Sequence, residues 1–107
     1  MLLDPKNIEE ETLMNFKGGE GELITRNYID DKSKIMFSCL RPGASSGLHR
    51  HEGNAEIVYI ISGTAVLNYD GVEETVSAGQ VHYCPDGHSH FMMNRSEEDV
   101  HYLAVVK

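Results

Sequence analysis

Residues able to bind a metal ion are concentrated in one stretch near the middle of the chain. His49 and His51 are separated by a single residue, and Glu56 follows after a short Glu52-Gly53-Asn54 segment. Because side chains alternate along an extended strand, the two histidines share one face and lie about 7 Å apart. The intervening segment predicts a turn that brings Glu56 to the same face. Two histidines and a carboxylate suit divalent iron, manganese, nickel, cobalt, copper or zinc.

A fourth ligand is predicted in the second half of the chain. Pro85-Asp86-Gly87 has the composition of a tight turn, and such a turn directs the first inward side chain of the next strand, which we assign to His90. Four protein ligands leave an octahedral ion two open positions for a substrate or dioxygen. One alternative is that these are ordinary surface or core histidines. Another is a closed zinc site that only stabilises the fold, although such sites are usually rich in cysteine.

Short strands are predicted to position these residues. From residue 22 onward, runs of β-branched and aromatic residues alternate with turns, including Asp70-Gly71, a strong hairpin signal. The predicted strands cover residues 23–29, 35–40, 57–61, 64–69, 72–77, 81–84, 91–93 and 100–106. This pattern predicts an all-β sandwich or barrel. We expect one barrel domain over residues 22–107, preceded by an N-terminal arm or short helix over residues 1–21.

Composition excludes several classes of partner. The chain has 107 residues and a net charge of −8, which argues against binding to nucleic acid or to anionic membranes. No apolar run approaches the length of about 20 residues that a spanning helix needs. Asp4 lies where a secretion signal would need an apolar segment, so we expect a cytoplasmic protein. Cys39 and Cys84 are interpreted as partly buried thiols rather than as a disulfide or catalytic pair.

Two spaced patterns resemble the paired motifs of the cupin family. The first is Gly43-x5-His49-x-His51-x4-Glu56-x6-Gly63, and the second is Gly79-x5-Pro85-x-Gly87-x2-His90-x3-Asn94. Residues 64–78 separate them, which is similar to the short spacing of small single-domain bacterial cupins of the cupin type-2 conserved barrel family.

The resemblance implies a double-stranded β-helix, or jelly-roll barrel, with a metal ion near one end of its interior. It implies His49, His51, Glu56 and His90 as the metal ligands, and a homodimer. It does not fix a reaction, because proteins that share these motifs include dioxygenases, isomerases, epimerases, lyases, decarboxylases and non-catalytic sugar-binding domains.

Two functions therefore stay open. The first is an enzyme acting on a small oxygen-chelating substrate, of the dioxygenase, sugar or keto-acid isomerase, or lyase type. The second is a metal-dependent module that binds or senses a small ligand without turnover. The candidate catalytic groups are Glu56, His88 and His101: His88 either lines the cavity mouth or faces water, and His101 is either an inward acid–base group or a polar residue packed against the sheet. We assign no role to His82.

Alternation also predicts which side chains face outward. If His90 points inward, so does Met92, which would form a wall of the binding pocket. If Glu56 points inward, then Ile57, Tyr59 and Ile61 form an apolar stripe on the outer face. We expect either the N-terminal segment or a second subunit to cover this stripe, and the predicted partner is a second copy in a homodimer.

Overall fold

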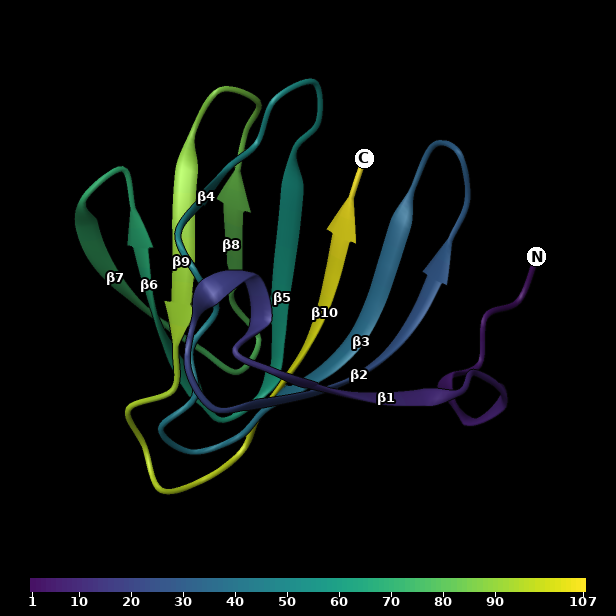
Figure 1. The fold of residues 1–107 in the computed structure, drawn as a ribbon, viewed down its shortest axis with the longest axis horizontal. Coiled ribbons are helices and arrows are strands. Elements are labelled where there is room, and N and C mark those ends of the chain that lie inside the picture. The colour runs from purple at the N-terminus through teal and green to yellow at the C-terminus, as the bar shows by residue number, and fades with distance from the viewer.

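The strands form two antiparallel sheets that face each other in the computed structural model, which describes residues 1–107 (Figure 1). One sheet has the order β1-β2-β3-β10-β5-β8, and the other has the order β4-β9-β6-β7. The elements are η1 (Pro5–Asn7), β1 (Glu10–Met14), η2 (Phe16–Gly18), β2 (Glu22–Ile29), β3 (Lys34–Leu40), β4 (His49–Arg50), β5 (Glu56–Ser62), β6 (Thr64–Tyr69), β7 (Val72–Ser77), β8 (Val81–Cys84), β9 (Ser89–Met93) and β10 (Val100–Val106). The all-β jelly-roll barrel predicted from the sequence is confirmed.

Side chains alternate between the space enclosed by the sheets and their outer faces, as the pleat of a strand requires. In β5, Val58 and Ile60 are buried, whereas Ile57, Tyr59 and Ile61 are exposed, as predicted. The enclosed apolar side chains form one cluster that includes Leu23, Met36, Leu40, Val58, Ile60, Leu67, Val76, Met92, Val100 and Ala104. Burying a large aliphatic side chain contributes about 1.5–3 kcal/mol. This cluster therefore holds the two sheets in a fixed relation around the site.

The first residues depart from the predicted arm or short helix. Pro5–Asn7 is a single 3-10 turn, and Glu10–Met14 forms a strand that pairs antiparallel with β2. Arg26 of β2 secures the segment, because its guanidinium donates to the backbone carbonyl of Ile8 at 2.7 Å and pairs with Glu10. A polar strand thus forms through its partner rather than through its own propensity. No helix in the structure is long and apolar enough to span a membrane.

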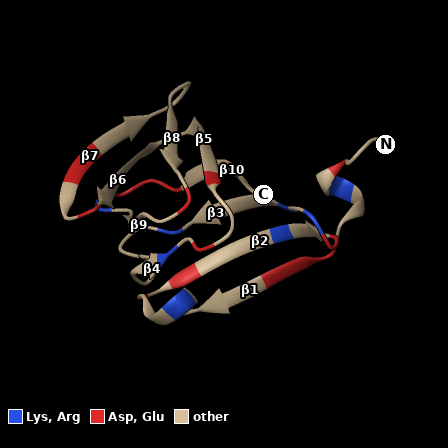
Figure 2. Ribbon diagram, turned by 90° about the horizontal axis from the view of Figure 1, so that it is seen from above, with Lys and Arg blue, Asp and Glu red and all other residues tan.

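Acidic side chains lie on an outermost strand of each sheet (Figure 2). Glu10 and Glu11 lie on β1, and Glu73 and Glu74 lie on β7. Charged residues on an edge strand oppose pairing with a further strand.

The last residue of the second motif, Asn94, has a structural role. Its buried side-chain amide donates to the backbone carbonyls of Leu40 and Glu98, at 2.9 and 2.7 Å. Its own backbone carbonyl accepts from the N–H of Gly43, the first residue of the first motif, at 2.8 Å. Asn94 therefore joins the loops at one end of the barrel.

Candidate metal centre

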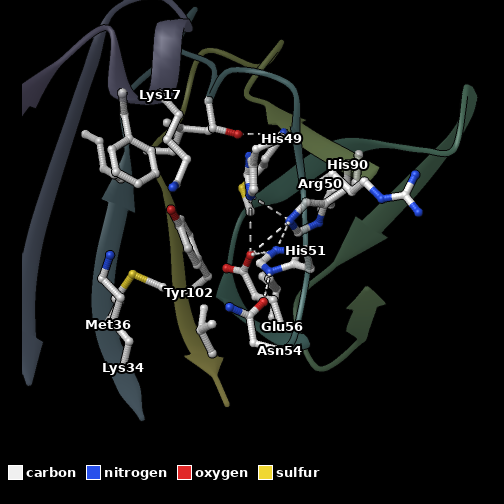
Figure 3. A pocket seen from close by; sticks show the side chains of 18 of the residues that line it. Lys17, Lys34, Met36, His49, Arg50, His51, Asn54, Glu56, His90 and Tyr102 are labelled. Carbon is white, nitrogen blue, oxygen red and sulfur yellow. Dashed lines mark hydrogen bonds and ion pairs between the residues drawn. The ribbon is translucent and has the colours of Figure 1, made fainter. Parts of the chain in front are cut away.

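Four side chains from both sheets point at one common position (Figure 3). His49 comes from β4, His51 from the loop that follows it, Glu56 from the start of β5 and His90 from β9. The Nε2 atom of His90 lies 3.0 Å from the Nε2 atoms of both His49 and His51, and 2.9 Å from Oε1 of Glu56. The structure thus brings together the four residues predicted as ligands, with one donor atom of each within 4.8 Å of the others.

Strand pairing and one loop create this convergence. His49 lies directly opposite His90 in the register of β4 and β9. The loop between His51 and Glu56 reverses the chain, and the backbone N–H of Gly53 fixes it by donating to the Asp86 carboxylate at 2.8 Å. Glu56 is the first residue of β5 and shares the inward face with Val58 and Ile60.

Each of the three imidazoles has a hydrogen-bond partner behind it. Nδ1 of His49 lies 2.8 Å from the carbonyl oxygen of Gly47, and Nδ1 of His51 lies 2.6 Å from Oδ1 of Asn54. Nδ1 of His90 lies 2.9 Å from Nε2 of His82. A carbonyl oxygen can only accept, so the Nδ1 atoms of His49 and His51 carry the proton and donate it.

The chemistry of these atoms fits a bound cation. When Nδ1 of a neutral imidazole carries the proton, Nε2 presents a lone pair. Lone pairs of nitrogen and a carboxylate oxygen that converge at hydrogen-bonding distance repel one another unless a cation or protons lie between them. A histidine that donates its other ring N–H to an oxygen acceptor is the usual arrangement of a metal ligand.

The ionisation states of Glu56 and His90 also suit a bound metal ion. Burial alone would raise the pKa of Glu56, but the imidazole rings of His49 and His90 beside the carboxylate outweigh it and hold that pKa below its ordinary value. Burial lowers the pKa of His90, although the Glu56 carboxylate opposes this effect. An ionised Glu56 and a neutral His90 are the forms that bind metal.

The four side chains lie on the wall of a cavity of about 340 Å³. Met92, predicted as a pocket wall, lines it and is buried. Lys17, Lys34 and Tyr102 also line it (Figure 3). Burial raises the pKa of Tyr102, and the charge of Glu56 raises it further, so this phenol stays protonated at neutral pH.

Lys17 is placed against the cavity by a close backbone contact. A Cβ atom on Gly47 would lie 1.7 Å from the carbonyl oxygen of Lys17, so only glycine allows this approach. The N–H of Gly47 also donates to the carbonyl of Phe16 at 2.9 Å. Lys17 itself has a φ of 53°, a left-handed conformation that is uncommon for a residue with a side chain. Gly47 therefore connects the Lys17 segment to the His49 ring.

His88 and His101, the other predicted catalytic candidates, do not line this cavity. The ring of His88 stacks on Tyr69 and pairs with Asp70 at the β6–β7 turn, where it is partly exposed. His101 is exposed on the outer face of β10, because its neighbours Val100 and Tyr102 take the inward positions.

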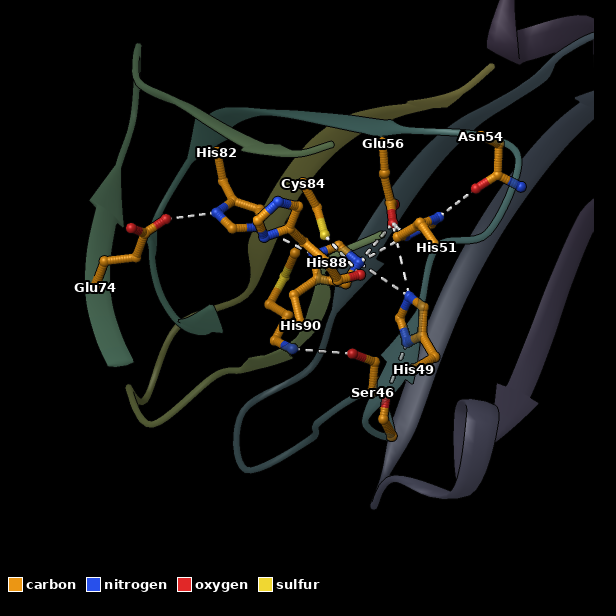
Figure 4. A network of polar contacts seen from close by, with 12 residues as sticks. Ser46, His49, His51, Asn54, Glu56, Glu74, His82, Cys84, His88 and His90 are labelled. Carbon is orange, nitrogen blue, oxygen red and sulfur yellow. Dashed lines mark hydrogen bonds and ion pairs between the residues drawn. The ribbon is translucent and has the colours of Figure 1, made fainter. Parts of the chain in front are cut away.

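His82, to which the sequence assigned no role, is the main residue that sequence reasoning missed. It is almost fully buried and contacts His90 directly (Figure 4). The signal was present in the alternation of β8, where Val81 and Tyr83 are exposed and His82 shares the buried face with Cys84. The ring nitrogens of a buried histidine need polar partners, and on the inward face of a barrel that holds other histidines those histidines are the nearest candidates.

The cysteines match the interpretation as isolated thiols. Cys39 is partly buried, Cys84 is buried, and both are free. Burial raises the pKa of each thiol to about 11, so neither is a ready nucleophile.

Known proteins with similar sequences and structures share this architecture. A protein of Thermotoga maritima described as an oxalate-binding protein is 34% identical over an aligned length of 112 residues, and the alignment covers 99% of this chain and 93% of that protein. The crystal structure of a predicted oxalate decarboxylase from Thermotoga maritima has a TM-score of 0.92 and 33% identity, covering 99% of this chain and 97% of the other. A sugar phosphate isomerase from a cupin superfamily of Silicibacter pomeroyi shares the fold, with a TM-score of 0.82, 23% identity and coverage of 100% and 75%.

The family model described as the cupin domain matches residues 36–106, a range that includes both histidine motifs and all four convergent side chains. With this match and a relative that aligns along nearly its whole length, the chain belongs to the cupin family.

Proposed function

We propose that this chain binds a small carboxylate-bearing molecule, of the size and charge of oxalate, through a divalent metal ion held by His49, His51, Glu56 and His90. The observation that carries the proposal is the convergence of three imidazole nitrogens and one carboxylate on the wall of a cavity that two lysines also line. The Thermotoga maritima relative described as oxalate-binding supports the same class of ligand.

The donor set suits iron, manganese, nickel, cobalt, copper or zinc in the divalent state. When bound, such an ion supplies a Lewis acid with positions open to two adjacent oxygens of a ligand. The contribution of the chain is to hold its rings in place: Gly47, Asn54 and His82 fix the orientations of the three imidazoles before a metal arrives.

Lys17 and Lys34 favour a negatively charged ligand. They reach the cavity from η2 and β3, two segments on the opposite side of the cavity from His90 (Figure 3). The chain as a whole has a net charge of −8, but two ammonium groups beside one cavity favour a positive electrostatic potential there, which attracts anions. The protonated phenol of Tyr102 adds a hydrogen-bond donor for a carboxylate oxygen. Arg50 contributes less, because its guanidinium turns toward Glu52 at the rim.

Turnover of the bound ligand is a second candidate function, favoured by the presence of Glu56 and Tyr102 in the same cavity. Of the three predicted acid–base residues, Glu56 alone lies there. An enzyme built on this site would therefore move protons through Glu56 or Tyr102. The dioxygenase, isomerase and lyase activities inferred from the sequence stay predictions of reaction type.

Calorimetric titration of oxalate into metal-loaded protein tests the proposal. We expect saturable binding that disappears after chelator treatment, and much weaker binding of acetate, which has one carboxylate. Lys17→Met should weaken oxalate binding about tenfold by removing a charge-assisted contact. Lys32→Met, on the exposed β2–β3 turn and outside the cavity, is the matched control. Equal oxalate binding with and without metal would refute the proposal, and release of carbon dioxide would establish turnover.

We also propose that the exposed apolar stripe of β5 packs against a second copy of the chain. Ile57, Tyr59 and Ile61 are 47%, 42% and 54% exposed, and the N-terminal segment does not cover them. Across the β5–β8 pairing they continue into Tyr83 and Val81 on the same outer face. Light scattering should give a dimer that Tyr59→Glu converts to a monomer; a monomeric unchanged chain would refute this. The cytoplasmic location stays a prediction.

A further inference from the structure

His82 lies between the two sheets and has a polar partner on each ring nitrogen (Figure 4). Its Nε2 lies 2.9 Å from Nδ1 of His90, and its Nδ1 pairs with the carboxylate of Glu74. The rings of His82 and His90 stack, with centroids 5.2 Å apart and planes 20° from parallel. A continuous path of polar contacts therefore runs from Glu74, which is 46% exposed, to the candidate metal centre.

The direction of the protons along this path follows from its outer end. An ionised carboxylate can only accept, so Glu74 requires the proton of His82 on Nδ1. A neutral His82 then presents a lone pair at Nε2, which accepts the Nδ1 proton of His90. That arrangement leaves Nε2 of His90 unprotonated, and this is the atom that faces His49, His51 and Glu56.

We propose that Glu74 and His82 are positioning residues that hold His90 in the ring orientation and tautomer needed to bind metal. The proposal rests on the metal-binding function proposed above and adds a surface carboxylate that controls it. Glu74 lies on β7 and His90 on β9 in one sheet, whereas His82 lies on β8 in the other. The path therefore also joins the two sheets behind the site.

The opposite tautomer of His82 shows why Glu74 matters. Without a carboxylate at Nδ1, His82 is free to carry its proton on Nε2 and donate it to Nδ1 of His90. The His90 proton then moves to Nε2, where it blocks the lone pair that would bind metal. Removing a hydrogen-bond partner behind a metal ligand typically lowers metal affinity by about 10- to 100-fold.

Glu74→Ala tests the proposal without disturbing the core, because Glu74 is a surface residue on an edge strand. Glu74→Gln keeps an oxygen acceptor but adds an N–H donor, so it can pair with either tautomer of His82 and should have an intermediate effect. Glu73→Ala is the matched control: Glu73 is the preceding residue on the same strand and pairs instead with Arg95. The two measurements are the zinc affinity, by competition with a chromophoric chelator, and the His90 tautomer, by long-range nitrogen–proton NMR of the metal-free full-length protein.

We expect Glu74→Ala to weaken zinc binding by about tenfold or more and to add a population of His90 protonated at Nε2. Glu73→Ala should stay close to the unchanged protein in both measurements, and Glu74→Gln should lie between the unchanged protein and Glu74→Ala. An unaltered tautomer and zinc affinity in Glu74→Ala would overturn the proposal, as would an equal loss in Glu73→Ala. Failure of the unchanged protein to bind zinc would count against the proposed function, whereas the tautomer of the metal-free protein still decides the role of Glu74.

Discussion

Glu56→Gln should abolish most of the stabilisation that a metal ion gives to this protein. Oε1 of Glu56 lies 2.9, 3.0 and 3.7 Å from the Nε2 atoms of His90, His51 and His49. Glutamine fills the same space, but it removes the one negative charge among the four donor groups. The remaining three nitrogens are neutral, so nothing in the site then offsets the positive charge of a divalent ion.

The size of the effect follows from binding linkage. A ligand present at 100 times its dissociation constant stabilises the folded state by about 2.7 kcal/mol. Losing a partner behind a ligand lowers metal affinity by up to about 100-fold. If losing the charge of a ligand itself weakens binding by about this factor or more, the same concentration provides at most about 0.4 kcal/mol. For a domain of this size, about 1 kcal/mol changes the melting temperature by about 4 °C. The metal-induced shift should therefore fall from about 11 °C to about 2 °C.

Thermal melts with zinc and with chelator measure this shift for each protein separately, so any change in metal-free stability cancels. Glu52→Gln is the control, because it removes the same charge from a residue that lines the same cavity. Glu52, however, is exposed and pairs with Arg50. Glu52→Gln should keep the full shift. A full shift in Glu56→Gln, or an equal loss in Glu52→Gln, would show that Glu56 does not act as a ligand.

Three further predictions follow from single features. Gly47→Ala should weaken oxalate binding and lower the melting temperature, as measured by calorimetry and thermal melts, because its Cβ would collide with the Lys17 carbonyl. As the pH falls from 7.5 to 5.5, the free energy of unfolding of the metal-free protein, measured with denaturant, should decrease. Burial lowers the pKa of His90 in the folded protein below 6.5, so the unfolded chain binds the proton first as the pH falls. A flat profile would contradict this. Cys39 and Cys84 should react with iodoacetamide at pH 8 about 100-fold more slowly than an exposed thiol, because burial raises each pKa to about 11.

The strands of the barrel were predictable because their patterns are local. Alternation in residues 57–61 and the Asp70-Gly71 turn each specify one element with little help from the rest of the chain. Strand β1 was not predictable in this way. Its sequence, Glu10–Met14, is mostly polar, and it becomes a strand because β2 supplies both the ladder of hydrogen bonds and the Arg26 contacts. Such a partner can be found only once the fold is known.

The residues of the candidate site also fall into those that local sequence predicts and those that only the fold brings together. His49, His51, Glu56 and His90 were identified because their spacing in two motifs can be read directly. The groups that surround them come from segments with no spacing relation to those motifs. Lys17, Lys34 and Tyr102 reach the cavity from η2, β3 and β10, and only the closure of the barrel brings them together.

The supports of the three imidazoles differ in how much of the fold they depend on. His49 is held by a backbone carbonyl two residues away, and His51 by a side chain three residues away. His90 is held by His82, which belongs to the opposite sheet. The first two supports need only a local loop, whereas the third needs the sheets to stay packed at their present separation. A substitution that loosens the core between the sheets should therefore displace His90 in the candidate metal centre before it disturbs the other two rings.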